Sequence, residues 1–162
     1  MAELTQLESK VAEVMGLAQA AQESTRKVIR LVDDKEVKAA LTQMRAEASE
    51  TEKRCKALAA ELEGKKSAVQ KKAKETKTEA HEMMQTYLGE DADGLDGLEF
   101  MMMVEAGELG HVEIVRRMNK RARDPRVREL VDWVLPIQLR HVKETTKAAL
   151  KLADEEDPNS TG

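Results

Sequence analysis

Two short stretches of the sequence carry acids and histidines at spacings that suit metal chemistry. One contains Glu105, Glu108 and His111, and the other contains Gln138 and His141. Residues three apart on a helix project from nearly the same face, so each stretch can offer two ligands to one metal ion or to neighbouring ions. Imidazole and carboxylate ligands together suit iron, manganese or zinc. The two stretches therefore predict a carboxylate–histidine metal site, with no catalytic residue assigned.

Long helices are the elements that must position these side chains. Hydrophobic residues make up 41% of the chain, charged residues 36% and aromatic residues 2%, a balance that suits amphipathic helices rather than a β-sandwich. Capping residues, glycines and prolines divide the chain into five helical segments, at about 5–31, 33–64, 65–88, 96–121 and 124–153. The predicted fold class is all-α, with one bundle domain over residues 1–153 and a flexible tail over residues 154–162.

The third segment is too long to be a tight connection between neighbouring helices. About 24 helical residues span about 36 Å, which is the length of a neighbouring helix, whereas connections in bundles typically take about two to eight residues. We expect a helical crossover that returns the chain to its starting end. The second and fourth helices then run parallel, as in a four-helix bundle with one long connection.

Counting residues from the two tight turns, near 33 and 124, places several of the candidate ligands at one depth. Glu105 and His141 fall within the apolar stripes of their helices, and the first hairpin offers small residues such as Ala18 and Ala48 at that level. A lone carboxylate in a core is usually paired, protonated or bound to a cation. The predicted metal-binding set is Glu47, Glu105, Glu108, His111, Gln138 and His141.

Two interpretations of Glu105 and His141 stay open at this point. They are either a hydrogen-bonded buried pair that fixes the register of the helices, or they are metal ligands. The buried acid at 105 favours the metal site, whereas the lack of a histidine on the second helix favours the metal-free pair. For His111 a structural role is the simpler interpretation, because it lies off the apolar stripe.

Several short motifs resemble the ferritin-like superfamily, and within it the YciF-like stress-associated branch. They are the stretches 34–41, 50–52, 64–66 and 110–114, and the resemblance covers about residues 5–153. It implies a ferritin-like four-helix bundle and a role in stress or metal handling. The superfamily pattern places a glutamate on the first helix and Glu-x-x-His on the second. This chain offers Gln19, Gln22 or Glu23 on the first, Glu47-x-x-Glu50 on the second, and Gln138 where a glutamate is expected.

These departures lead to a hypothesis with one alternative. The expected function is that of a ferritin-like bundle with a degenerate or mononuclear carboxylate–histidine site for Fe or Mn, with Zn less favoured. Any activity would then be that of a metal-dependent oxidoreductase. The alternative is a metal-free helical scaffold that acts through partner binding or self-association.

Charge and cysteine content limit the partners and the compartment. A formal net charge of −4 argues against nucleic acid as the main partner, because binding phosphates requires a basic face. The single cysteine, Cys55, excludes an intrachain disulfide and permits a reducing compartment. No stretch approaches the roughly 20 apolar residues that span a bilayer, and the first residues do not read as a signal peptide. The expectation is a soluble, cytoplasmic protein, with a possible homodimer and an unknown protein partner.

Overall fold

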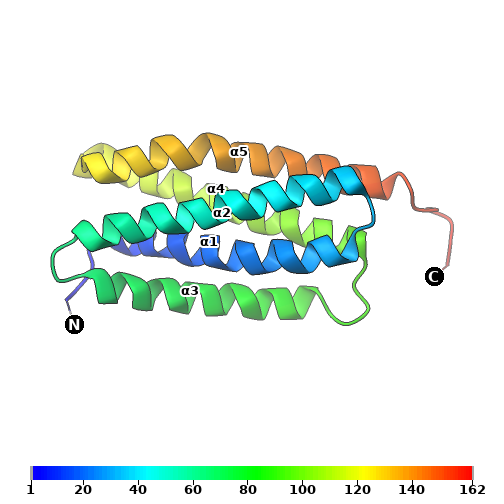
Figure 1. The fold of residues 1–162 in the computed structure, drawn as a ribbon, viewed down its shortest axis with the longest axis horizontal. Coiled ribbons are helices and arrows are strands. Elements are labelled where there is room, and N and C mark those ends of the chain that lie inside the picture. The colour runs from blue at the N-terminus through cyan, green and yellow to red at the C-terminus, as the bar shows by residue number, and fades with distance from the viewer. Residues whose placement is uncertain (1, 162) are drawn as a thin grey trace.

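The computed structural model describes residues 2–161, and all regular structure in that range is α-helical (Figure 1). The predicted all-α class and the five helical segments are confirmed. Residues 1 and 162, the outer limits of the predicted domain and tail, lie outside the described residues. The helices are α1 (Gln6–Leu31), α2 (Lys35–Glu61), α3 (Lys66–Tyr87), α4 (Gly94–Ala122) and α5 (Pro125–Ala153).

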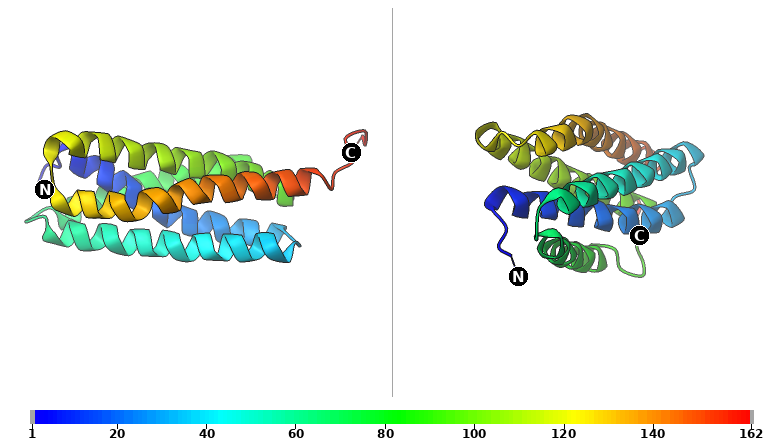
Figure 2. Two further views of the ribbon diagram at one scale, coloured as in Figure 1. Left: turned by 90° about the horizontal axis from the view of Figure 1, so that it is seen from above. Right: turned by 60° about the vertical axis from the view of Figure 1, so that its left-hand side comes forward.

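Two helical hairpins pack face to face, and α3 lies outside them. The hairpin α1–α2 contacts the hairpin α4–α5 through the pairs α1·α4 and α2·α5, while α3 packs mainly on α1. Figure 2 shows α3 on the outer side of α1. The third segment, whose length predicted a helical crossover, forms α3. Because α3 carries the chain back to the end of the bundle where α2 begins, α2 and α4 run in the same direction (Figure 1).

The starts of α2 and α4 differ slightly from the predicted ones. Asp34 rather than Asp33 caps α2, since its carboxylate accepts a hydrogen bond from the Val37 N–H at 3.0 Å. At α4 the reciprocal capping pair is Asp93 and Asp96, with distances of 2.9 and 3.0 Å, so the helix begins two residues earlier than predicted. This earlier start requires glycine at position 94, because a Cβ there would lie 2.9 Å from the Leu31 carbonyl oxygen.

The interior consists of two apolar clusters with buried polar residues between them. One cluster lies in the half of the bundle that holds the α4–α5 turn and includes Leu58 and Leu130. The other lies in the opposite half and includes Leu41 and Met101. Cys55 is fully buried, and burial raises the pKa of its thiol to about 12, so it acts as a small core residue. The polar residues that divide the core are those predicted to share one depth.

Gly16 lies where α1 closely approaches the backbone of α3. A Cβ at position 16 would collide with the carbonyl oxygen of Ala73 and lie 2.8 Å from the Cβ of Thr76. We expect Gly16→Ala to lower the free energy of unfolding by about 1–3 kcal/mol, because backbone cannot move aside as a flexible side chain can. Urea denaturation followed by circular dichroism measures the change.

The matched control is Gly110→Ala in α4, where a Cβ would meet nothing within 4 Å. Removing a glycine from the interior of a helix should raise the free energy of unfolding by about 0.5–1 kcal/mol. Opposite signs at the two positions would support the close packing of α3 on α1. Stabilisation by both substitutions would contradict it.

Candidate functional site

Five of the six predicted ligand residues meet at the middle of the bundle, in what we call the central polar layer. Glu105 and Glu108 come from α4, Gln138 and His141 from α5, and Glu47 from α2. Glu105 and His141 are 1% and 3% exposed. Side chains from three helices therefore share one depth, as residue counting from the two turns predicted.

The imidazole of His141 stands between two carboxylates. Its Nδ1 lies 3.4 Å from Glu105 Oε2, and its Nε2 lies 3.3 Å from Glu47 Oε1. A neutral imidazole would present an unprotonated nitrogen to one of these acceptors, so the geometry favours the doubly protonated cation. Burial acts to lower the pKa of His141, but hydrogen bonds and charge from Glu105 and Glu47 outweigh it. The net result is a pKa raised above 6.5.

Glu47 is also held by Arg140, which extends the layer toward the surface. The guanidinium donates to both carboxylate oxygens, with a distance of 3.0 Å for Nη1 to Oε1. Burial acts to raise the pKa of Glu47, but Arg140 and His141 together bring it below its ordinary value. Arg140 lies off the apolar stripe, so the apolar spacing did not predict its place in the layer. Its spacing of four from Glu144, whose carboxylate lies 3.6 Å away, is the signal that marks it as part of a charged set.

On the other side of His141, the layer holds two neighbouring carboxyl groups. The amide nitrogen of Gln138 donates to Glu105 and lies 3.1 Å from Glu108 Oε2. Burial, followed by the charge of Glu105 and a hydrogen bond to it, raises the pKa of Glu108 well above its ordinary value. This raised pKa favours the protonated form of Glu108, which can donate a hydrogen bond to Glu105. Arg140 and His141 lie against the carboxyl groups of Glu47 and Glu105.

The structure does not bring His111 into the central polar layer. His111 is partly exposed, with Nδ1 2.9 Å from the Gly107 carbonyl oxygen and Nε2 3.4 Å from Glu13. The glutamines of the first helix are also occupied elsewhere. Gln19 and Gln22 donate to the carboxylate of Glu52 at 3.1 and 3.0 Å. The first helix consequently contributes no polar ligand to the layer.

A small cavity lies beside the layer, on the side of the first hairpin. Its volume is about 10 Å³, roughly that of a single water-sized probe. Ala18 and Ala48 border it on one side, and Glu108, Gln138 and His141 border it on the other. The small residues of the first hairpin thus leave room at this level, as the sequence predicted.

The side chains of the layer do not converge on a common point as metal ligands do. Among residues 2–161, no three His, Cys, Asp or Glu side chains are grouped so that they could hold a metal ion. The His141 ring separates Glu47 from Glu105, and the Gln138 amide nitrogen, a donor, faces Glu105 and Glu108. In this arrangement the residues hold protons and do not fit a metal ion.

Comparison with known proteins identified no relative of this chain. No family model matches the chain, and no curated protein or solved structure matches it. The resemblance to the ferritin-like superfamily therefore still rests on the short motifs. Within the part of the chain that the structure describes, every helix is too short or too polar to serve as a membrane span.

Stability should depend on pH through the two groups that bind protons more tightly when folded. The pKa values of Glu108 and His141 both lie above their ordinary values of 4.5 and 6.5. Their contribution is full below those ordinary values and is lost as pH rises through the folded-state pKa. We expect the free energy of unfolding, measured in urea, to fall as pH rises above 6.5.

Glu108→Gln separates the two contributions, because its amide keeps a donor toward Glu105 and cannot ionise. This variant should lose less stability at alkaline pH than the unaltered chain does. Glu113→Gln, an exposed position on the same helix, should leave the pH profile unchanged. Identical profiles for the unaltered chain and Glu108→Gln would show that the proton is not held at Glu108.

Removing the carboxylate at the centre of the layer should be costly. Glu105→Ala leaves His141 with one carboxylate and Gln138 without its main acceptor. Breaking a buried charge pair from one side typically costs about 3–5 kcal/mol. Urea denaturation should therefore show a large loss for Glu105→Ala and a change within about 0.5 kcal/mol for Glu99→Ala, which is exposed on the same helix. A Glu105→Ala variant that unfolds like the unaltered chain would contradict the pairing.

Proposed function

We propose that this chain is a metal-free helical scaffold that acts through protein contacts made at its surface. The observation that carries the proposal is that every possible ligand side chain in the central polar layer already has a hydrogen-bond or ion-pair partner within the protein. Glu47 accepts from Arg140, Glu105 accepts from Gln138 and lies beside His141, and Glu108 lies within hydrogen-bonding distance of Gln138. Because these side chains pair with one another, the layer serves to hold the helices together.

Within such a scaffold the layer would fix the axial register of the helices. Apolar stripes tolerate a slip of one helical turn, because one apolar residue replaces another at nearly equal cost. A slip that moved His141 away from Glu105 would leave two buried charges unpaired, a loss of several kcal/mol. The apolar clusters on either side supply stability, and the layer would select one alignment of α4, α5 and α2.

The exposed surface supports a role in association. Among the described residues, large apolar side chains are exposed on the outer faces of both α4 and α5, namely Met103, Ile114, Leu139 and Leu150. The two ends of the bundle also carry opposite charge. Basic residues gather around the α4–α5 turn, and acidic residues gather at the opposite end, before α4 and after α5. Such polarity gives a rod-shaped scaffold two distinct ends for binding.

A ferritin-like arrangement is the finer description that we propose for the fold. Two antiparallel hairpins, a helical crossover and the parallel course of α2 and α4 support it. The link to stress or metal handling rests on the motif resemblance alone, and a cytoplasmic location is likewise proposed.

A cation site for Fe or Mn is the second candidate, and the small cavity beside Glu108 and His141 is the observation that favours it. Turning the Gln138 amide would present its oxygen instead of its nitrogen, so that the side chains around the cavity could offer carboxylate, imidazole and amide ligands. An ion there would displace the proton that Glu108 holds. Metal binding would consequently strengthen as pH rises.

Metal analysis of the purified chain separates the two candidates. Protein prepared without chelator should contain Fe, Mn and Zn far below one equivalent, and adding each metal should leave the thermal midpoint unchanged. The reason is that ions binding only the folded state would raise that midpoint. One equivalent of metal, lost in Glu108→Gln and retained in Glu113→Gln, would overturn the scaffold proposal in favour of the cation site.

A further inference from the structure

The end of the bundle at the α4–α5 turn, which we call the basic end, carries an open cleft lined with cations. The cleft has a volume of about 550 Å³, and Arg116, Lys120, Arg123 and Arg128 are among the side chains that line it. Arg123 ends α4 in the left-handed conformation, with φ of 57°, a backbone state that an arginine rarely adopts. The turn therefore holds four long cationic side chains around one concave surface.

Most of the positive charge at the basic end is not neutralised within the chain. Arg116 lies 3.4 Å from Glu113, and Arg128 lies 3.8 Å from Asp132. Asp124, the other acid of the cleft, is bound by Arg126. In the part of the chain that the structure describes, four further cations at this end form no ion pair, namely Arg117, Lys120, Arg121 and Arg123. Four uncompensated charges close together favour an anionic partner.

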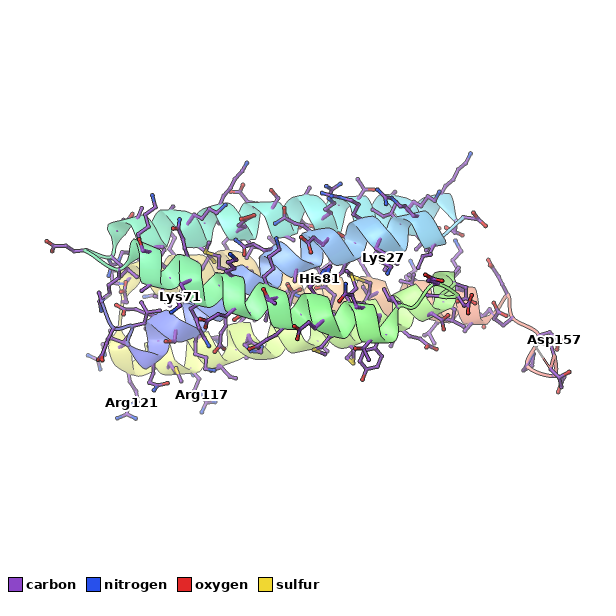
Figure 3. The ribbon with its side chains drawn as sticks, turned by 90° about the horizontal axis from the view of Figure 1, so that it is seen from below. Lys27, Lys71, His81, Arg117, Arg121 and Asp157 are labelled. Carbon is purple, nitrogen blue, oxygen red and sulfur yellow. The ribbon has the colours of Figure 1, made fainter. Side chains whose placement is uncertain are left out.

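A matching set of acids follows α5 at the opposite end of the rod. The acidic segment (residues 154–157) contains Asp154, Glu155, Glu156 and Asp157, all exposed. Within residues 2–161 none of the four forms an ion pair. Figure 3 shows Arg117 and Arg121 at one end of the molecule and Asp157 at the other, beyond the end of the bundle.

The acidic segment cannot reach the basic end of its own chain. The 29 residues of α5 span about 44 Å, with the basic end at the start of the helix. Asp157 stands four residues past the end of α5, a reach of about 14 Å even when fully extended. Any contact between these two charged regions is therefore a contact between two copies.

We infer that the basic end binds the acidic segment of a second copy of this chain, so that the scaffold associates head to tail. The inference rests on the proposed scaffold function and names its partner. Four acids on a short protruding segment meet four unpaired cations at the basic end, two of which, Lys120 and Arg123, line the cleft. A larger anionic surface, such as a nucleic acid, is disfavoured by the net charge of −4, since the rest of the molecule would repel it.

Head-to-tail contacts join different surfaces, so each added copy presents a free basic end and a free acidic segment. Such interfaces produce rings or open chains rather than a closed pair. Because the contacts are exposed ion pairs, they should weaken as added salt shortens the screening length below about 10 Å. Association should thus grow with protein concentration and disappear at high salt.

Charge exchange tests the inference by sedimentation equilibrium. One variant reverses the basic end (Arg117→Glu, Lys120→Glu and Arg121→Glu), and another reverses the segment (Glu155→Lys, Glu156→Lys and Asp157→Lys). At an ionic strength of about 0.05 M, the unaltered chain should exceed its monomer mass of 18.1 kDa. Each variant alone should lose association, and an equimolar mixture of the two should regain it.

The matched control reverses three other exposed acids at the same end of the rod, Glu90→Lys, Asp91→Lys and Glu99→Lys. It should associate like the unaltered chain, and circular dichroism should show that every variant stays helical. A monomeric unaltered chain at low salt, or a mixture that stays monomeric, would overturn the inference. Association that is lost only with the basic-end variant would show that a different anion binds the cleft. None of these results bears on metal content, so the scaffold proposal is tested separately.

Discussion

The carboxylate of Glu105 is 1% exposed and must have a cation beside it, because an unpaired charge in a protein interior costs several kcal/mol. His141 supplies that cation at 3.4 Å, which fixes α5 against α4. The same imidazole needs a second carboxylate at its other nitrogen, and Glu47 brings in α2. Glu108 forms no ion pair within residues 2–161, and burial beside Glu105 raises its pKa. One buried charge thus determines the relative placement of three helices and the protonation of the layer.

Two groups of unpaired charges lie at opposite ends of the molecule, outside this layer. Capping chemistry accounts for part of the pattern, since acids at helix starts and bases at helix ends offset the helix dipole. The unpaired cations at the α4–α5 turn and the acids at 154–157 exceed what capping uses. The resulting scaffold has an apolar interior divided by one paired polar layer and carries oppositely charged groups at its two ends, which suits contacts made end to end.

Residue patterns predicted the helices and the depth of the layer, because apolar spacing and turn residues are local signals. They located Glu105, Glu108 and His141 at one level by counting alone. They placed His111 off the apolar stripe but did not identify its partner Glu13, which lies on another helix. They also missed Arg140, which is recruited by Glu47 across the α2–α5 contact. Whether acids and imidazoles converge on one ion or form a hydrogen-bonded chain depends on rotamers and crossing angles, and sequence spacing contains neither.

The charge state of the His141 ring tests this account most directly. The chain has three histidines, so ¹⁵N and ¹H NMR of the imidazoles, assigned with a His141→Gln variant, can follow this ring individually. The account predicts that both ring nitrogens of His141 carry protons at pH 6, and that the pKa of this ring lies above its ordinary value of 6.5. A neutral His141 ring at pH 6, with one unprotonated nitrogen in the folded protein, would contradict the pairing on which the layer depends.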